Sequence, residues 1–339
     1  MSIIGGMFSF PLAQERSCLP PFMKDDSILM SNARSCIALL ADLLLPANIW
    51  VPSYLCHTIL SGIKMQKVRF FPVNYDLQPD HDGWIDEVKE GDLVIFIDYF
   101  GWHFSTEYIV RAKSRGAWVL EDACQALLTN GVGKLADFVV FSPRKFLGIP
   151  DGGILNINTQ EISVSDIQLE RPPADWWMKS VTSLILRWQF DICGGSREWY
   201  ELYKEVEAEN KAARYSMSEL SRVLLMHAFN YQEIARRRIE NYHVLAEYLG
   251  EIAMFPNLAK GIVPLGFPIR VRNRDSLREA LFAENIYPPV HWPIAGIVPQ
   301  EFRESHRLAG DIMMIPCDQR YSADDMNRVA SIIRKEVYR

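Results

Sequence analysis

Two stretches of this 339-residue chain decide its fold: Val119-Leu-Glu-Asp-Ala-Cys-Gln125 and Phe138-Val-Val-Phe-Ser-Pro-Arg-Lys-Phe-Leu-Gly-Ile-Pro-Asp-Gly-Gly153. Each begins as a short apolar run, typical of a strand that is buried on both faces, and then turns polar. In open α/β sheets, ligands bind at the carboxyl ends of the strands. We therefore expect Asp122, Ser142 and Lys145 to lie at a ligand site.

Strand-like and helix-like segments alternate around these two stretches. Strands are predicted at 49–51, 68–71, 93–97, 117–120, 138–141 and 154–157. Helices are predicted from Asn32 through Leu43, over 53–64 and over 105–114. Such alternation favours parallel pairing through right-handed crossovers. The predicted fold class is therefore α/β, with a large, mostly parallel sheet and helices on both faces.

The chain is long for a single hydrophobic core, so two closely joined domains are expected. After about Ala174 the pattern is helical, with helices predicted over 176–191, 197–211, 216–229 and 232–249. Near the end it mixes again, with strands at 267–271 and 312–315 and helices at 274–285 and 322–336. We place a large ligand-binding α/β domain at 1–230 and a small α+β domain at 231–339.

Composition excludes several classes of protein. A net charge of −6 argues against a nucleic-acid binder, which needs basic surface. The six cysteines form no CxxC pair and no metal-ligand spacing, so no metal site is expected. We see no signal-peptide pattern and no apolar run long enough to span a bilayer, and we expect a cytoplasmic protein without a membrane partner. The apolar segment 176–190 is interpreted as an amphipathic helix that is buried or lies at a subunit interface.

The residue types at the strand ends fit the chemistry of pyridoxal 5′-phosphate (PLP). That chemistry needs a lysine amine for the Schiff base, an acid beside the pyridine nitrogen and donors around the phosphate. Lys145, Asp122 and Ser142 supply these groups. Alone, Lys145 would be interpreted as a surface lysine and Asp122 as a helix cap; together they predict a PLP site.

With these residues in place, the sequence resembles the DegT/StrS group of nucleotide-sugar aminotransferases, which are fold-type-I PLP enzymes. Their pattern EDAAQA, then a strand, then FSFHPTKNLTTGEGG, corresponds to 121–126 and 141–153 here. Shorter matches follow in family order: Asn32-Ala-Arg-Ser-Cys36, Val51-Pro-Ser-Tyr-Leu-Cys56, Tyr215-Ser-Met-Ser-Glu-Leu220, Arg236-Arg-Arg238 with Tyr242, His291-Trp-Pro293, and Met314-Ile-Pro316 with Arg320-Tyr321. The resemblance covers most of the chain and implies a sheet of the seven-stranded type.

The resemblance also implies roles for individual residues. Lys145 would form the internal aldimine with PLP, Asp122 would pair with the pyridinium nitrogen, and Gln125 would hydrogen-bond the ring oxygen. Ser142 would bind the phosphate. The backbone amides of Ser35 and Cys36 would do the same, because a helix N-terminus favours an anion. His291 is a candidate for substrate contact, with a purely structural role as the alternative.

The chain departs from the family pattern at three places. The stretch between Ser142 and Lys145 is two residues shorter, which gives the S-x-x-K spacing of other fold-type-I aminotransferases. The aromatic residue that stacks on the ring maps to Cys56, so Tyr54 or His57 would have to replace it. The asparagine that reaches the phosphate from the partner subunit maps to Arg214. This arginine would either bind phosphate through its paired donors or be a surface charge.

The implied function is transfer of an amino group from a donor such as glutamate to a nucleotide-linked keto-sugar. Family members are homodimers with shared active sites, and a surface-sugar pathway such as lipopolysaccharide synthesis is the expected setting. One alternative is a PLP-dependent sugar dehydratase, but those relatives carry histidine in place of the lysine. Another is a regulatory protein that binds PLP or a sugar nucleotide without turnover. A nicotinamide enzyme is disfavoured, because the glycine pattern that begins at Gly131-Val-Gly133 is incomplete.

Overall fold

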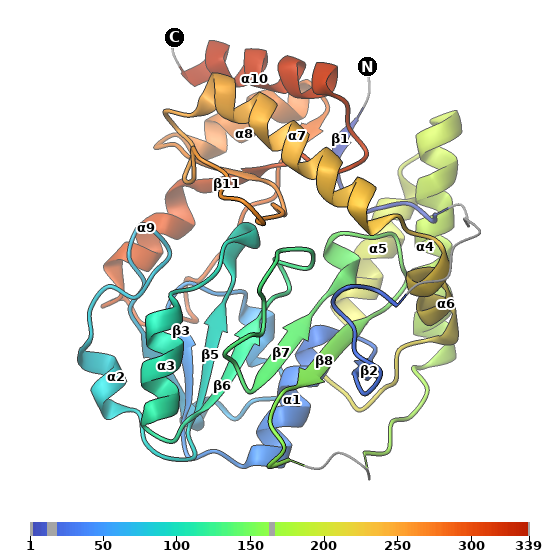
Figure 1. Cartoon of the computed structure of the whole chain (residues 1–339). Coiled ribbons are helices and arrows are strands. Elements are labelled where there is room, and N and C mark those ends of the chain that lie inside the picture. The colour runs from blue at the N-terminus through green and yellow to red at the C-terminus, as the bar shows by residue number, and fades with distance from the viewer. Residues whose placement is uncertain (1–2, 12–18, 163–166, 338–339) are drawn as a thin grey trace.

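A seven-stranded sheet forms the centre of the structure, a computed structural model that describes residues 3–11, 19–162 and 167–337 (Figure 1). The strands lie in the order β2-β8-β7-β6-β5-β3-β4. Their bounds are β2 (Ile28–Met30), β3 (Ile49–Pro52), β4 (Val68–Phe71), β5 (Leu93–Ile97), β6 (Trp118–Asp122), β7 (Phe138–Phe141) and β8 (Gly153–Ile157). All pairs from β4 to β7 are parallel, and β8 runs antiparallel to both of its neighbours. The predicted α/β class with a mostly parallel sheet is confirmed.

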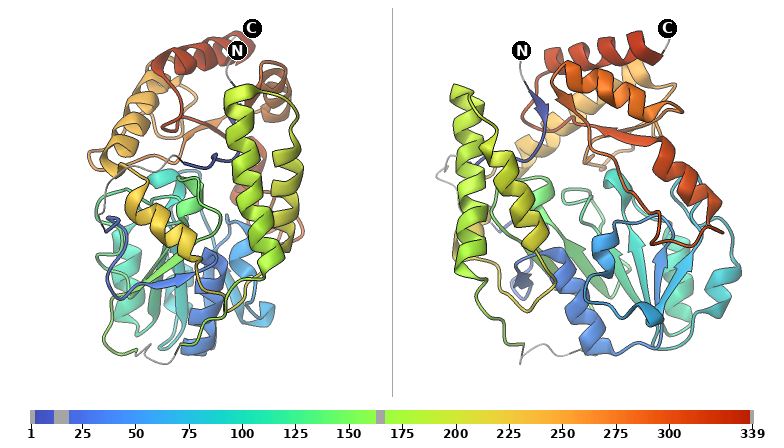
Figure 2. Two further views of the ribbon diagram at one scale, coloured as in Figure 1. Left: turned by 90° about the vertical axis from the view of Figure 1, so that its right-hand side faces the viewer. Right: turned by 180° about the vertical axis from the view of Figure 1, so that it is seen from behind.

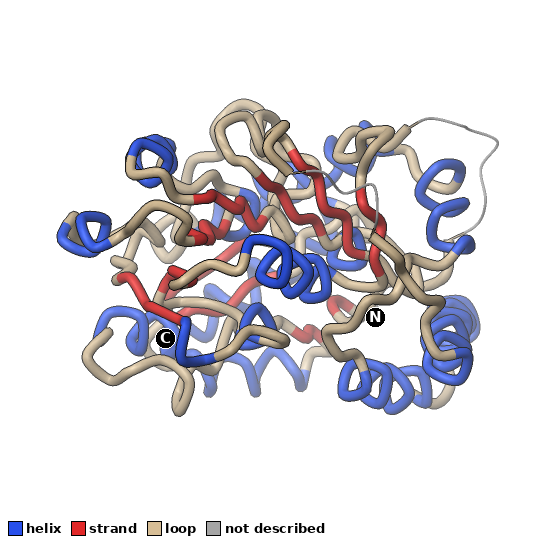
Figure 3. Tube along the Cα trace, turned by 90° about the horizontal axis from the view of Figure 1, so that it is seen from below, coloured by secondary structure: helices blue, strands red, loops and turns tan. Residues whose placement is uncertain are grey.

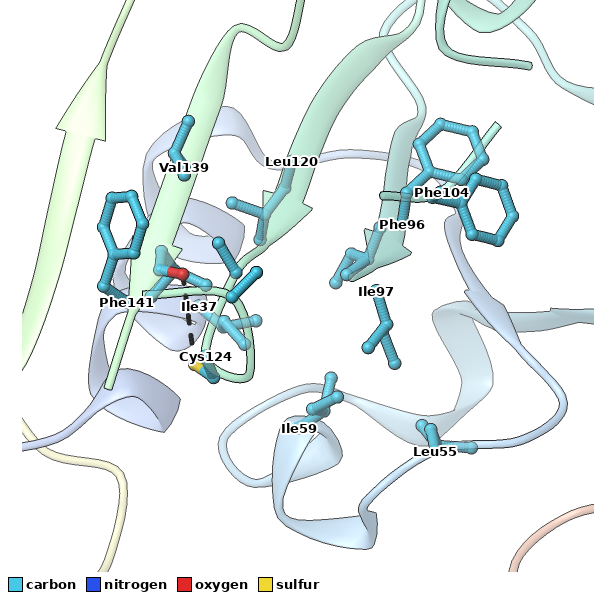
Figure 4. Close-up of a cluster of buried hydrophobic side chains, with 14 of the residues drawn as sticks. Ile37, Leu55, Ile59, Phe96, Ile97, Phe104, Leu120, Cys124, Val139 and Phe141 are labelled. Atoms are coloured by element: carbon cyan, nitrogen blue, oxygen red, sulfur yellow. Dashed lines mark hydrogen bonds between the residues drawn. The ribbon is translucent and has the colours of Figure 1, made fainter. Parts of the chain in front are cut away.

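The central strands are apolar because helices cover both faces of the sheet. Every residue of β5 is buried, as expected for a parallel strand with no solvent-exposed face. Helix α1 (Ala33–Leu44) packs against β7 and β8, whereas α3 (Thr106–Ser114) packs against β6. Figure 3 shows helices on both sides of the strands. Figure 4 shows Phe96, Leu120 and Val139 of three adjacent strands in one buried cluster with Ile37 of α1.

The start of α1 is held close to the sheet by a cap and a glycine. The Asn32 side chain accepts a hydrogen bond from the Ser35 backbone N–H at 2.9 Å, which caps the helix as expected for asparagine at this position. A Cβ atom on Gly153 of β8 would lie 2.2 Å from the Asn32 carbonyl carbon, so only glycine allows this approach. The first turn of α1 therefore lies at the carboxyl ends of the parallel strands.

One predicted helix is wrong. Over 53–64 the chain forms only a short 3-10 turn at His57–Leu60, followed by another at Met65–Lys67. Gly62 has a φ of +83°, a left-handed conformation that an α-helix cannot include. Two short helices, α2 (Gly83–Glu87) and α9 (Arg303–Asp311), lie where the pattern predicted none.

The second half of the chain supplies a helical hairpin and a second hydrophobic cluster. Helices α4 (Ala174–Cys193) and α5 (Glu198–Glu209) pack against each other beside the sheet (Figure 2), and α6 (Glu219–His227) follows. The second cluster gathers α7 (Tyr231–Leu249), α8 (Arg274–Ala283), α10 (Ala323–Val337) and the antiparallel pair β9 (Phe267–Arg270) and β11 (Ile312–Ile315). No described helix is long and apolar enough to cross a membrane.

The N-terminal strand β1 (Ile4–Gly5) joins this second cluster, although it comes first in the sequence. It pairs in parallel with β10 (Ile286–Tyr287), and Ile4 is fully buried there. The predicted boundary between residues 230 and 231 stays a prediction. The contacts of β1 show that the N-terminal segment lies against the C-terminal part of the chain.

Candidate active site

A cavity of about 570 Å³ lies at the carboxyl ends of the parallel strands. Four parts of the chain form its wall: the strand ends, the start of α1, the α4–α5 hairpin, and the segments that flank β1 and β10. The predicted site residues that line it are Cys56, Asp122, Gln125, Ser142, Lys145 and His291. Residues separated by up to 235 positions in the sequence therefore face one space.

Lys145 is exposed to this cavity, and its neighbour Arg144 anchors the turn that carries it. Arg144 Nη2 lies 2.6 Å from Glu207 Oε1 of α5, and Arg34 Nη2 of α1 lies 3.8 Å from Glu207 Oε2. Burial raises the pKa of Glu207, but Arg144, Arg34 and Lys145 together outweigh this effect and hold the pKa below its usual value. The charged carboxylate thus ties the Lys145 turn to two helices. Sequence reasoning missed this ion pair because Glu207 lies 63 positions from Arg144.

Asp122 and Gln125 form the end of β6 and the turn that follows it. Asp122 is 4% exposed, and its Oδ1 accepts a hydrogen bond from the Cys124 N–H at 3.0 Å. Gln125 Oε1 accepts a hydrogen bond from the Phe100 N–H at 2.6 Å, which fixes the orientation of the amide. Within the described part of the chain, Gln125 Nε2 is buried without a hydrogen-bond partner. A buried N–H donor without an acceptor costs free energy, so we expect an acceptor atom of a bound ligand at this position.

His291 and Trp292, which follow β10 in the sequence, form one wall of the cavity. His291 Nδ1 is buried and has no hydrogen-bond partner among the described residues. Burial and the nearby Lys145 cation lower the pKa of His291 to about 3, so its ring is neutral. The Tyr54 hydroxyl donates to the His291 carbonyl oxygen, and the Tyr54 ring lies 5.4 Å from the Trp292 ring. Trp292 lines the cavity, whereas Tyr54 is fully buried and supports it from behind.

The other predicted residues lie outside the cavity. Ser35 and Cys36 are buried in α1, and the Ser35 N–H already donates to Asn32; Asn32, Ala33 and Arg34 line the cavity instead. His57 is exposed and lines a separate depression. Arg214 is exposed and pairs with Asp42 at 3.3 Å. The roles expected for Ser35, Cys36, Tyr54, His57 and Arg214 stay predictions.

Three arginines line the end of the cavity formed by the α4–α5 hairpin and α8: Arg187, Arg197 and Arg278. The Arg187 guanidinium lies 4.5 Å from the centre of the Trp199 ring, and its Nε is 2.7 Å from Asp191. Arg197 lies 4.7 Å from the Tyr287 ring. No local sequence signal marks these residues, because only the folded chain brings the hairpin beside α8. Together they make this end suited to an anionic ligand.

Comparisons with known proteins agree with this geometry. The family model of the DegT/DnrJ/EryC1/StrS aminotransferases matches residues 86–334. A UDP-N-acetyl-3-dehydro-alpha-D-glucosamine 3-aminotransferase from Acidithiobacillus ferrooxidans is 25% identical over 245 residues, which cover 67% of this chain and 59% of that protein. The chain thus spans about three fifths of the length of this relative.

Solved structures share the fold at low sequence identity. PseC from Helicobacter pylori, an aminotransferase involved in the biosynthesis of pseudoaminic acid, has a TM-score of 0.67 and 13% identity, over 92% of this chain and 86% of its own. NtdA from Bacillus subtilis with bound cofactor PMP has a TM-score of 0.65 and 14% identity, over 94% of this chain and 74% of its own. At these identities the likeness shows the fold alone. The family match extends over well more than half of the sequence, and the chain belongs to the DegT/DnrJ/EryC1/StrS aminotransferase family.

Proposed function

We propose that this chain is a PLP-dependent aminotransferase that transfers an amino group from glutamate, or a similar donor, to a nucleotide-linked keto-sugar. One observation carries the proposal: the side chains of Lys145, Asp122 and Gln125 surround a single cavity at the strand ends. Membership of an aminotransferase family agrees with it.

The residues present fit PLP. The buried Gln125 Nε2, which has no partner in the described chain, suits the ring oxygen as an acceptor. Asp122 is a buried carboxylate suited to a protonated ring nitrogen. Ser142 and the start of α1 offer donors for the phosphate. Trp292 supplies an aromatic face in the cavity, where the family pattern expects one at Cys56.

When bound, PLP supplies an electron sink that stabilises negative charge on the substrate carbon. Lys145 would hold the cofactor through its amine, and its freed amine would take the proton from the substrate Cα as general base and deliver it to the cofactor carbon as general acid. Asp122 would keep the ring nitrogen protonated. The Arg144–Glu207 pair keeps the Lys145 turn in place. His291, being neutral, offers a hydrogen-bonding ring nitrogen without adding charge beside Lys145.

A nucleotide-linked substrate is supported by the charge at the far end of the cavity. Arg187, Arg197 and Arg278 face a space that continues from Lys145. Guanidinium groups match phosphate oxygens through paired donors, so this end suits a diphosphate group. The curated relative, which acts on a UDP-linked sugar by its name, agrees with that choice.

A homodimer is supported by the exposed face of α4. Met178, Ile185, Trp188 and Ile192 are large apolar side chains that are 38% to 64% exposed. In such a dimer, Arg214 would reach the partner's cavity, as the resemblance implies. We place the enzyme in the cytoplasm, in synthesis of surface sugars such as those of lipopolysaccharide.

The test is spectroscopic. Purified protein mixed with PLP should turn yellow, glutamate should bleach the colour, and a suitable keto-sugar nucleotide should restore it. Lys145→Ala should lose the Schiff-base absorption. Lys134→Ala is the matched control, because Lys134 lies in a loop outside the cavity and its loss should leave the absorption unchanged.

Two results would overturn the proposal. Wild-type protein that never acquires the yellow colour is not a PLP enzyme. Protein that turns yellow but is not bleached by any amino acid in a panel binds the cofactor without transamination, as a regulatory protein would.

A further inference from the structure

A second group of polar side chains lies beside the cavity but does not line it. Asp98 follows β5, Glu121 lies in β6, and His103 belongs to the loop between β5 and α3. His103 Nδ1 lies 3.6 Å from Asp98 Oδ2 and 3.8 Å from Glu121 Oε1. The three ligand atoms all lie within 4.8 Å of one another. Because successive residues of a strand point to opposite faces, Glu121 points away from the side that Asp122 serves.

In each of these three side chains, the polar atom that does not face the other two already has a hydrogen-bond partner. Asp98 Oδ1 accepts from the Phe104 N–H at 2.9 Å, and Glu121 Oε2 accepts from the Gly133 N–H at 2.8 Å. His103 Nε2 lies 2.8 Å from the Asn130 carbonyl oxygen, which can only accept, so Nε2 carries the proton. Nδ1 is therefore the ring nitrogen that faces the two carboxylates, and without a proton it would offer its lone pair to a metal ion. Metal-binding histidines are held by the same kind of second bond.

The distances suit a shared cation better than direct hydrogen bonds. Both Nδ1-to-oxygen distances exceed the 2.7–3.2 Å range of a good N–H···O bond. Ligands about 2.0–2.2 Å from one metal ion lie roughly 3–4 Å from each other. In addition, Asp98 Oδ2 is buried and has no hydrogen-bond partner in the described chain, and it faces His103. That oxygen is therefore available to a ligand.

Charge balance also favours a doubly charged ion. Asp98 and Glu121 are both buried, and within the described residues no lysine or arginine forms an ion pair with either one. A protonated His103 would supply one positive charge against two carboxylates, whereas a divalent ion supplies two.

We propose that Asp98, His103 and Glu121 form a site for a divalent cation, with Zn²⁺ as the best match. One imidazole and two carboxylates are ligands that zinc accepts, and water would complete the coordination. The His103 side chain is 31% exposed, which leaves a path for the ion. The bound ion joins the ends of β5 and β6 to the 98–104 loop. Phe100 of this loop holds Gln125 Oε1, so the ion supports the back of the cavity.

The test measures zinc on the whole protein, purified without a histidine tag and stripped with a chelator. Calorimetric titration with zinc sulfate should give one ion per chain, and the thermal midpoint should rise by several degrees. His103→Asn should weaken the affinity by at least about 100-fold, since it removes a ligand. His243→Asn is the matched control, because His243 is exposed on α7 and its loss should leave zinc binding unchanged.

Glu121→Gln is the second variant, in case His103→Asn does not fold. A glutamine oxygen keeps the bond from the Gly133 N–H while the charge is lost, and zinc affinity should again fall. The proposal is overturned if the wild type takes up no zinc, or if folded His103→Asn and Glu121→Gln proteins bind it as tightly as the wild type. Neither measurement uses PLP, so a failure of the aminotransferase proposal would not affect them.

Discussion

The two sides of β6 differ in the kind of polar atom that they leave without a partner. Toward the cavity, Asp122 lies beside Gln125 Nε2, a donor without a hydrogen-bond partner in the described chain. On the other side, Glu121 lies beside Asp98 Oδ2, an acceptor in the same state. Buried polar atoms without partners are costly, so each side is arranged for a ligand. Under the two proposals, adjacent carboxylates in one strand would serve ligands of opposite character: a cofactor with acceptor oxygens and a metal cation.

Replacing Asp122 by asparagine removes the carboxylate on the cavity side of β6 and keeps the shape of the side chain. Asp122→Asn should lower kcat/KM by roughly 10²–10⁴-fold, because removing one partner of a buried charge pair costs about 3–5 kcal/mol. Steady-state kinetics with saturating PLP would measure this effect.

Glu121→Gln is the paired variant, and it should leave the Schiff-base absorption in place while it weakens zinc binding. Asp122→Asn should change the Schiff-base absorption and leave zinc binding normal. If both variants changed the PLP absorption equally, the two sides would not be separate sites.

Gln125 connects the two sides, and its replacement should have the next largest effect. Gln125→Leu leaves the buried Phe100 N–H without an acceptor, so the free energy of unfolding of the PLP-free protein should fall by about 1–3 kcal/mol. PLP affinity should also weaken about tenfold through loss of the bond from Nε2. Urea unfolding and PLP titration measure the two effects.

Gln78→Leu is the control for Gln125. Gln78 Oε1 accepts from the Ser105 N–H at 2.9 Å, a similar bond away from the cavity. This variant should lose stability and keep its PLP affinity. If both variants kept normal affinity, Gln125 would have only a structural role.

The sheet and the central site residues could be predicted because their signals are local. Apolar runs such as Leu93–Ile97 mark buried strands, and parallel strands bring their carboxyl ends to one edge. This is why Asp122, Ser142 and Lys145 were expected together and line one cavity. Their chemical roles remain to be tested.

The remaining features depend on tertiary contacts that no local pattern reveals. Glu207 meets Arg144 because the α4–α5 hairpin folds back beside the sheet. His103 meets Glu121 because a loop crosses the strand ends, and the cysteine pattern, which argued against a metal site, says nothing about this set. The helix predicted over 53–64 failed at Gly62, whose positive φ depends on its surroundings. Trp292 was part of a quoted motif, but its place in the cavity follows from packing on Tyr54.

His291, at the cavity, should make the stability of the protein depend on pH. Its pKa is about 3 in the folded protein, against an ordinary value near 6.5, so below pH 6.5 the unfolded chain binds a proton that the folded chain does not. The stability that it contributes is therefore complete above pH 6.5 and is lost as the pH falls toward 3. Between pH 7 and pH 5, the free energy of unfolding of the wild-type PLP-free protein should fall by about 1–2 kcal/mol more than that of His291→Asn. Urea unfolding at both pH values measures it, and an equal loss in the two proteins would contradict a buried neutral ring.

The smallest effect on stability is expected at Arg214, whose pair with Asp42 leaves the two side chains 55% and 60% exposed. Exposed pairs of this kind contribute little, so Arg214→Ala should change the free energy of unfolding by less than about 0.5 kcal/mol. If Arg214 reaches the phosphate in the partner's cavity, PLP affinity should nevertheless fall by about tenfold or more, because bonds to charged groups contribute about 1.5–3 kcal/mol. Arg222→Ala is the control, since Arg222 is similarly exposed and pairs within α6. If PLP affinity falls without a loss of stability, and the protein has the mass of a dimer in solution, then Arg214 of each chain completes the cofactor site of its partner. Unchanged affinity would make Arg214 a surface charge and would leave each cavity to be completed by its own chain.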